Sequence, residues 1–209
     1  MYAFEGLGSI YWHMVSKLLL AVIETVHAAE AAKCSDETLA GLKRAYYDIR
    51  DGIGFNKAPE VYGAFPTDPY SHTPGFAGAR QPGMTGQVKE EVLTRLAELG
   101  VKVANGSVRF FPSILRRREL LTESAVFQYF DIAGKQQSLV LSPGQIGFTY
   151  CQVPVVYTQS DTAGIVLTRS NGGSQQVIGN SLSSEVSNEI FKKNGAVTRI
   201  DVAISVLLD

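Results

Sequence analysis

The period of the hydrophobic pattern changes near residue 100, and this change limits the folds open to the chain. Before it, apolar residues recur every three to four positions, as in helices that bury one face. After it, short runs rich in Val, Ile, Phe and Tyr alternate with turn-forming residues, as in strands. We therefore predict an α+β fold, with helical hairpins in residues 1–100 and an antiparallel β-sandwich in residues 101–209.

The helical part begins with a predicted helical hairpin. The first helix covers residues 9–32, and its apolar face is so wide that we expect burial on most sides, between other helices. The second helix starts at Ser35 or Asp36, both good N-caps, and stops at Gly52 or Gly54.

A third helix is predicted after a long irregular segment. Thr85 can cap it and Gly100 can end it. Its inward stripe is predicted at Val88, Val92, Leu96 and Leu99.

The β part is predicted to open with a tight hairpin. Asn105-Gly106 lies between two β-prone runs, and this dipeptide accepts the positive φ angles of a type I′ turn. Further strands are predicted at 126–132, 136–141, 146–151, 153–158, 164–169, 174–179 and 197–207. Residues 183–191 are the exception, a short helix capped by Ser183 or Ser184.

Composition excludes several classes of partner. The formal net charge is -1, so no basic surface for nucleic acid or anionic lipid is expected. The apolar run 14–26 is short and interrupted by charges, which predicts no membrane span. It also lacks the basic residues before it and the small-residue cleavage site after it that a signal peptide has, and export stays open. Cys34 and Cys151 are far apart and are predicted to be free thiols. The histidines show no zinc-type spacing, so neither metal nor cofactor is predicted, and the compartment stays open.

Residues 55–87 are predicted to form a ligand-binding loop. The segment is rich in Pro, Gly and aromatic residues and lies between two helices. A loop of this length in a compact domain is usually functional or disordered, and this one is too aromatic for disorder. The ligand predicted for it is a carbohydrate.

Two carboxylates are candidates for catalysis. Glycoside cleavage uses a pair of carboxyl groups on opposite sides of the sugar. Glu5 precedes the first helix among glycines and aromatics, and Asp68 is held between Thr67 and Pro69 in the loop. Each also has a plain structural interpretation, because Glu5 would favour a helix N-terminus and Asp68 before a proline initiates turns.

Aromatic and imidazole side chains are candidates for binding the sugar. Tyr70 and His72 stand beside Asp68, where an imidazole could donate to a sugar hydroxyl or only tie the loop down. Trp12 offers a flat apolar ring for stacking, and His13 follows it on the same apolar helix. A plain role in the helical core would give the same sequence pattern for Trp12 and His13.

A second group of donors lies at the end of the loop. Arg80 and Gln81 precede Pro82-Gly83, and Gln87 follows at the start of the third helix. These guanidinium and amide groups converge near a helix N-terminus, where an anion or a cluster of hydroxyls could bind.

Four segments carry a resemblance to a known group of proteins. They are EGLGSIYWHMVSKLLLA (5–21), FNKAPEVYGAFPTDPYSHTP (55–74), ARQPGMTGQVKEEVLTRLAELGV (79–101) and GFTYCQVPVVY (147–157). Together they resemble the C-terminal portion of large carbohydrate-active proteins with an α/α toroid, the six-hairpin glycosidase-like group. The resemblance implies sugar chemistry, with the active site on the toroid and a β-sandwich beside it.

The chain departs from that group in its number of helices. A complete toroid has more helices than the three long ones predicted here. The resemblance therefore implies either the last hairpins of a longer glycoside hydrolase- or phosphorylase-like enzyme, or a short homologue with a helical cap on a sandwich. The expected partner is an oligosaccharide or glycoside, with further association through the exposed face of helix 9–32.

Two other functions remain open from the sequence. A non-catalytic carbohydrate-binding module would use the same aromatic residues without either carboxylate as a catalyst. A small protein-interaction domain would dimerise through the first helix and would not bind sugars.

Overall fold

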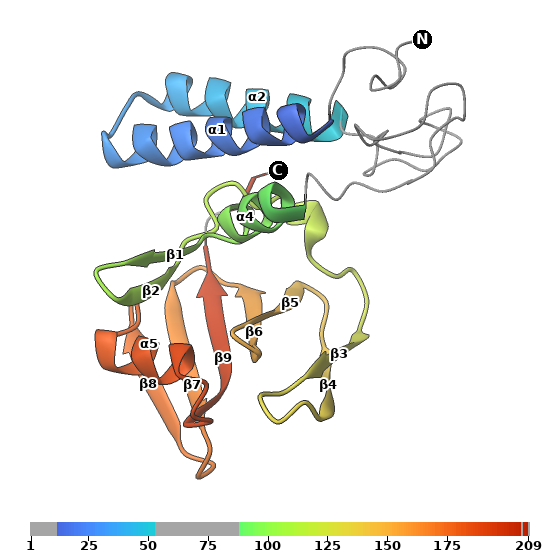
Figure 1. Ribbon diagram of the computed structural model, residues 1–209, viewed down its shortest axis with the longest axis vertical. Coiled ribbons are helices and arrows are strands. Elements are labelled where there is room, and N and C mark those ends of the chain that lie inside the picture. The colour runs from blue at the N-terminus through green and yellow to red at the C-terminus, as the bar shows by residue number, and fades with distance from the viewer. Residues whose placement is uncertain (1–11, 53–87, 206, 209) are drawn as a thin grey trace, which may run out of the picture. The chain divides into compact units, whose positions relative to one another are not determined.

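The computed structural model describes residues 12–52, 88–205 and 207–208 as a mixed α+β protein (Figure 1). It consists of two compact units, residues 1–95 and 96–209. The described helices are α1 (Trp12–Ala31), α2 (Asp36–Gly52), α4 (Val88–Glu98), α5 (Ser184–Phe191) and the 3-10 turn η2 (Arg117–Glu119). The strands are β1 (Val101–Ala104), β2 (Ser107–Phe110), β3 (Ala125–Phe130), β4 (Gln136–Leu141), β5 (Gln145–Tyr150), β6 (Val153–Gln159), β7 (Gly164–Arg169), β8 (Ser174–Ile178) and β9 (Val197–Ile204).

In the N-terminal unit, α1 and α2 form the predicted helical hairpin and lie side by side (Figure 1). Leu19, Ile23 and Val26 of α1 are buried, as are Tyr46 and Tyr47 of α2. Ser35 caps α2, because its hydroxyl accepts a hydrogen bond from the Thr38 backbone N–H at 3.3 Å. The pattern of one buried stripe on each helix explains why the two helices pair.

The predicted burial of α1 on most sides is wrong within the described residues. Met14 is 59% exposed and Leu18 is 53% exposed, one helical turn apart on the same face. Ser16, by contrast, is fully buried, and its hydroxyl donates to a carboxylate oxygen of Glu91 on α4 at 3.0 Å. The helix therefore buries one stripe and leaves an apolar strip in solvent.

The predicted inward stripe of α4 is also wrong at Val92. Val92 is 54% exposed, whereas Glu90, Thr94 and Glu98 are nearly fully buried along the helix. Thr94 donates its hydroxyl to the Glu90 carbonyl oxygen, one turn back, at 2.9 Å. The buried face of α4 therefore carries polar residues, which a hydrophobic period does not identify.

The C-terminal unit begins with the predicted hairpin. β1 and β2 pair antiparallel, and Asn105 and Gly106 have φ angles of 51° and 75°. These values fit the type I′ turn. The β2 strand is then tied to α5, because the Val108 N–H donates to the buried Ser187 hydroxyl at 2.9 Å.

The main sheet has five strands in the order β5-β6-β9-β7-β8 (Figure 1). β9 lies between β6 and β7 and runs parallel to β6, whereas every other described strand pair is antiparallel. The expectation of a wholly antiparallel β part is thus wrong at this pair. α5 supplies the crossover that returns the chain to the middle of the sheet.

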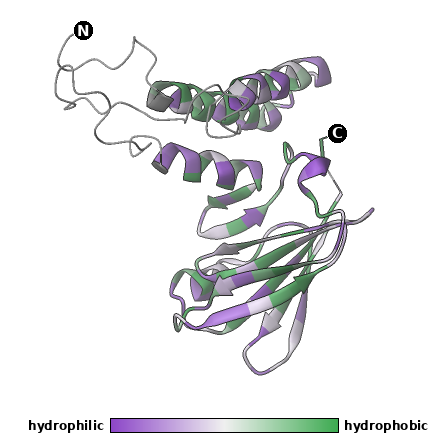
Figure 2. Ribbon diagram, turned by 90° about the vertical axis from the view of Figure 1, so that its right-hand side faces the viewer, coloured by the Kyte–Doolittle hydropathy of each residue, from purple (hydrophilic) through white to green (hydrophobic). Residues whose placement is uncertain are grey.

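The core of this unit lies on one face of the main sheet. Alternate residues of each strand point into it, as the alternating burial of β9 shows. Apolar stretches run along the central strands (Figure 2). The buried set includes Val155, Tyr157, Ile165, Leu167, Ile200 and Val202.

The β3–β4 hairpin packs against the opposite face of β5. Its inner side chains Phe127 and Leu141 come so close to Gly147 that a Cβ there would lie 3.0 and 2.9 Å from them. The outer side chains of the hairpin are exposed. This arrangement places the tip of the hairpin beside the β5–β6 turn.

Candidate functional site

The predicted site residues lie outside the part of the chain whose side chains the structure describes. Trp12 and His13 are in the first turn of α1, but their side chains are not among those described. The other predicted residues fall wholly outside the described ranges: Glu5, Asp68, Tyr70, His72, Arg80, Gln81 and Gln87. Their roles stay predictions.

A different site is present in the C-terminal unit, which we call the hairpin hollow. It has a volume of about 270 Å³ and lies between the tip of the β3–β4 hairpin, the β5–β6 turn and the start of β9. Its lining residues are Tyr129, Asp131, Ile132, Ala133, Gln137, Gln152, Val153, Pro154, Gly195, Val197 and Thr198. The mixture of apolar walls with a few polar groups is typical of small-molecule sites.

Asp131 is the carboxylate of the hairpin hollow, and the hairpin turn holds it firmly. One carboxylate oxygen accepts the backbone N–H groups of Ala133 and Lys135, each at 2.9 Å. The other accepts the Gln137 side-chain amide at 2.9 Å. The Gln137 amide and the backbone N–H groups hold the pKa of Asp131 below its ordinary value. The carboxylate is therefore ionised near neutral pH and acts as a hydrogen-bond acceptor.

Tyr129 provides the aromatic wall. Its ring stacks on that of Phe127, with centroids 5.5 Å apart and planes 21° apart. Burial raises the pKa of Tyr129, and the charge of Asp131 adds to this effect, so the hydroxyl keeps its proton. That hydroxyl makes no hydrogen bond to another described residue, so it remains available to a ligand.

The β5–β6 turn brings Gln152 to the hairpin tip. The Gln152 side-chain amide donates to the Asp131 carbonyl oxygen at 3.1 Å, and its oxygen accepts from the Lys193 ammonium at 2.8 Å. This bridge fixes the tip of the hairpin against the main sheet.

The turn that carries Gln152 is a two-residue hairpin turn. Tyr150 pairs with Val153, and Cys151 and Gln152 between them have φ angles of 50° and 66°. Positive φ at both central residues is what a type I′ turn requires. The turn therefore sets the direction in which Gln152 leaves the sheet.

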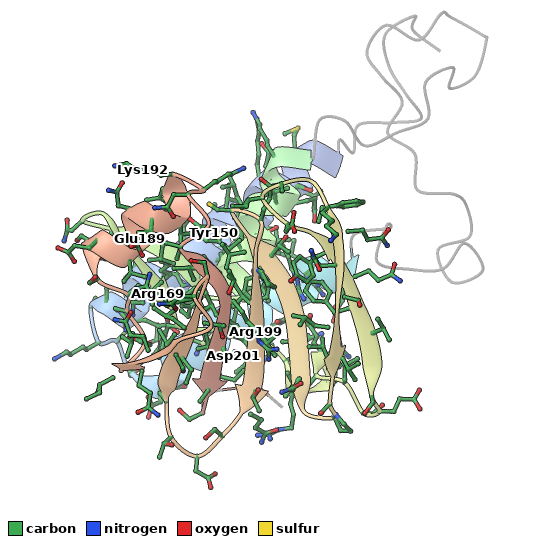
Figure 3. The ribbon with its side chains drawn as sticks, turned by 90° about the horizontal axis from the view of Figure 1, so that it is seen from below. Tyr150, Arg169, Glu189, Lys192, Arg199 and Asp201 are labelled. Atoms are coloured by element: carbon green, nitrogen blue, oxygen red, sulfur yellow. The ribbon has the colours of Figure 1, made fainter. Side chains whose placement is uncertain are left out.

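Arg199 and Asp201 lie next to each other on β9 (Figure 3), and the charge of Arg199 acts on Tyr129 of the hairpin hollow. Two donor nitrogens of Arg199, Nε and Nη2, bind the same Asp201 oxygen, at 2.9 and 2.5 Å. The positive charge of Arg199 partly offsets the rise in the Tyr129 pKa.

A second polar cluster is closed on itself. Arg169 of β7 donates to Glu189 of α5 and to the Gln175 side chain of β8 (Figure 3). The donors of Arg169 are thus directed at protein partners, and the cluster ties α5 to the sheet edge.

No motif in the sequence marks these residues as functional. Asp131 precedes Ile132-Ala133-Gly134, which is a plain turn signal, and the positive φ of Cys151-Gln152 contradicts the preference of both residue types. Cys34 is exposed and Cys151 is half-buried, and neither is in a disulfide. No group of three or more potential metal ligands occurs among the described residues, and none of the described helices is long and apolar enough to cross a membrane.

Comparisons with protein-family models and with curated proteins found no match for this chain.

Proposed function

We propose that the protein is carbohydrate-active and that the hairpin hollow binds one sugar unit. The observation that carries this proposal is the Tyr129 ring, which stands beside an ionised, rigidly held Asp131 carboxylate. An aromatic face covers the apolar side of a sugar ring, while a fixed carboxylate and amides accept and donate to its hydroxyls. The volume of about 270 Å³ falls just below the ~300–1,000 Å³ of drug-sized sites, which favours a ligand of monosaccharide size.

The chemistry of the hairpin hollow favours binding over cleavage. Glycoside hydrolysis needs one carboxyl group that keeps a proton and a second that does not. Asp131 is the single carboxylate among the lining residues, and its lowered pKa makes it a poor proton donor. We therefore assign this site the role of a non-catalytic sugar-binding site.

The catalytic proposal concerns the N-terminal unit. If the chain is the last part of a six-hairpin toroid followed by a β-sandwich, Glu5 and Asp68 are its carboxylates. The exposed Met14 and Leu18 of α1 support such a partial toroid, because further helices would cover them. Glu5→Gln and Asp68→Asn should then each lower turnover of the complete enzyme by orders of magnitude without unfolding it. Wild-type turnover in both variants would remove them from the mechanism.

The binding proposal is tested by melting the full chain with sugars. We would add glucose, galactose, mannose or xylose, and the β-linked disaccharide of each, at millimolar concentrations. A ligand at about a hundred times its Kd stabilises the folded state by about 2.7 kcal/mol. For a protein of this size the melting temperature then rises by roughly 5–10 °C.

The same samples distinguish binding from catalysis. A rise in melting temperature with the disaccharides still intact by chromatography is the expected result. Hydrolysis that survives Asp131→Ala would place catalysis elsewhere in the chain. A melting temperature that no sugar changes would contradict the proposal.

A further inference from the structure

One edge of the β3–β4 hairpin has no partner among the described residues. The Asp131 N–H donates to the Lys135 carbonyl oxygen at 3.0 Å, and β3 and β4 continue from there in regular antiparallel register. Because backbone groups alternate between the two edges of a strand, the N–H and C=O groups of Val126, Gln128 and Phe130 point away from β4. No backbone hydrogen bond joins these three residues to another described segment.

This free edge lacks the features that usually keep strand edges apart. β3 contains no charged residue, no proline and no glycine. Val126 and Phe130 are each 61% exposed, and Val140, which faces Val126 on β4, is 74% exposed. Natural edge strands normally carry a lysine, a proline or a bulge, so a neutral edge with exposed apolar side chains is a template for strand pairing.

The sequence of β3 is self-complementary about Gln128. Antiparallel pairing with a second copy, centred on this residue, would place Val126 opposite Phe130 and Gln128 opposite itself. The three outward-facing residues would then exchange both backbone hydrogen bonds with their counterparts. The Gln128 side-chain oxygen accepts from Gln136, and its amide N–H₂ group makes no bond to another described residue.

The middle of the pairing edge carries no charge. Glu123 precedes β3, and Asp131 and Lys135 lie beyond its other end, at the hairpin turn. Pairing along β3 itself therefore brings no like charges together within the strand.

We propose that β3 pairs edge to edge with β3 of a second copy of this chain, forming a symmetric dimer through a four-stranded sheet. The backbone hydrogen bonds supply the pairing, and Val126 and Phe130 supply apolar cross-strand contacts.

Sedimentation equilibrium of the full chain over a hundredfold range of concentration tests this pairing. Wild type should show a reversible monomer–dimer equilibrium. Gln128→Lys places like charges directly opposite each other and should weaken the dimer by about tenfold. Ser138→Lys is the matched control, since Ser138 faces Gln128 on the same exposed surface but lies on β4, away from the pairing edge. It should dimerise like wild type.

A mixture of two variants makes the test specific. Gln128→Lys and Gln128→Glu should each dimerise poorly alone, and their mixture should regain the association because the facing charges then attract. A monomer at all concentrations would overturn the proposal. Ser138→Lys weakening the dimer as much as Gln128→Lys would also overturn it. So would a dimer that is lost in Leu18→Ser, on α1, but kept in Gln128→Lys.

Discussion

The Tyr157 hydroxyl donates a hydrogen bond to the Leu99 carbonyl oxygen, 2.5 Å away, inside the core of the C-terminal unit. Tyr157 is fully buried on β6, and Leu99 lies just after α4 and is 4% exposed. A buried carbonyl group needs such a partner, because it has lost its hydrogen bond to water. The bond therefore fixes the start of the first hairpin, β1–β2, against the main sheet.

Tyr157→Phe should destabilise the C-terminal unit by about 1–3 kcal/mol, since the Leu99 carbonyl would stay buried without a donor. Urea unfolding of the full chain measures this loss. Tyr129→Phe is the control, because its hydroxyl has no such bond among the described residues, and its stability should stay within about 0.5 kcal/mol of wild type. Equal stability of Tyr157→Phe and wild type would show that the bond contributes nothing.

The same tyrosine predicts a loss of stability at alkaline pH. Burial holds the pKa of Tyr157 well above its ordinary value, so the folded state keeps a proton that the unfolded state loses. The contribution of Tyr157 to the free energy of unfolding is fully present below pH ~10, the pKa of a free tyrosine, and falls as the pH rises further. Between pH 10 and 11 the free energy of unfolding of Tyr157→Phe should fall less than that of wild type. Parallel curves for the two proteins would contradict the assignment.

Gly100 allows the chain to turn sharply between α4 and β1, and no other residue should replace it. Its φ is 66°, and a Cβ there would lie 2.0 Å from the Phe111 carbonyl carbon. Gly100→Ala should therefore cost more than about 4 kcal/mol or prevent folding. Gly106→Ala separates the two effects, because its φ is 75° but its nearest atom is 3.9 Å away. The free energy of unfolding of that variant, measured by thermal unfolding, should be only about 1–2 kcal/mol below that of wild type.

Sugar binding should weaken in acid through Asp131. Hydrogen bonds from Gln137 and the turn lower the pKa of Asp131, so the carboxylate is the stable form at neutral pH. The affinity should hold down to about pH 4, the ordinary value for Asp, and fall as the pH drops through the lowered pKa. Calorimetric titration measures the profile. Asp131→Asn should bind more weakly and lose this pH dependence, and an unchanged profile would exclude the carboxylate from the site.

Local signals predicted most of the secondary structure. Ser35 at the start of α2, Asn105-Gly106 in the first hairpin and Ser183 before α5 all act as their residue types predict. Each works through contacts within a few residues, so the sequence alone is sufficient to find them.

Features that depend on distant contacts were not predictable. The stripe predicted on α4 includes Val92, which is exposed, because Glu91 binds Ser16, which is 75 residues away. The insertion of β9 between β6 and β7 likewise depends on contacts between residues far apart in the sequence. The hairpin hollow combines Asp131, Gln152 and Thr198 from separate segments, and none of them carries a functional motif of its own.

The most direct test of the account compares two neighbouring aromatic residues of β3. Tyr129 lines the hairpin hollow, whereas Phe130 is 61% exposed on the opposite face. Calorimetric titration of Tyr129→Ala and Phe130→Ala with the best-binding sugar measures the role of each ring. We predict that Tyr129→Ala loses about tenfold or more in affinity and that Phe130→Ala binds like wild type. Equal affinities of the two variants would contradict sugar binding in the hairpin hollow.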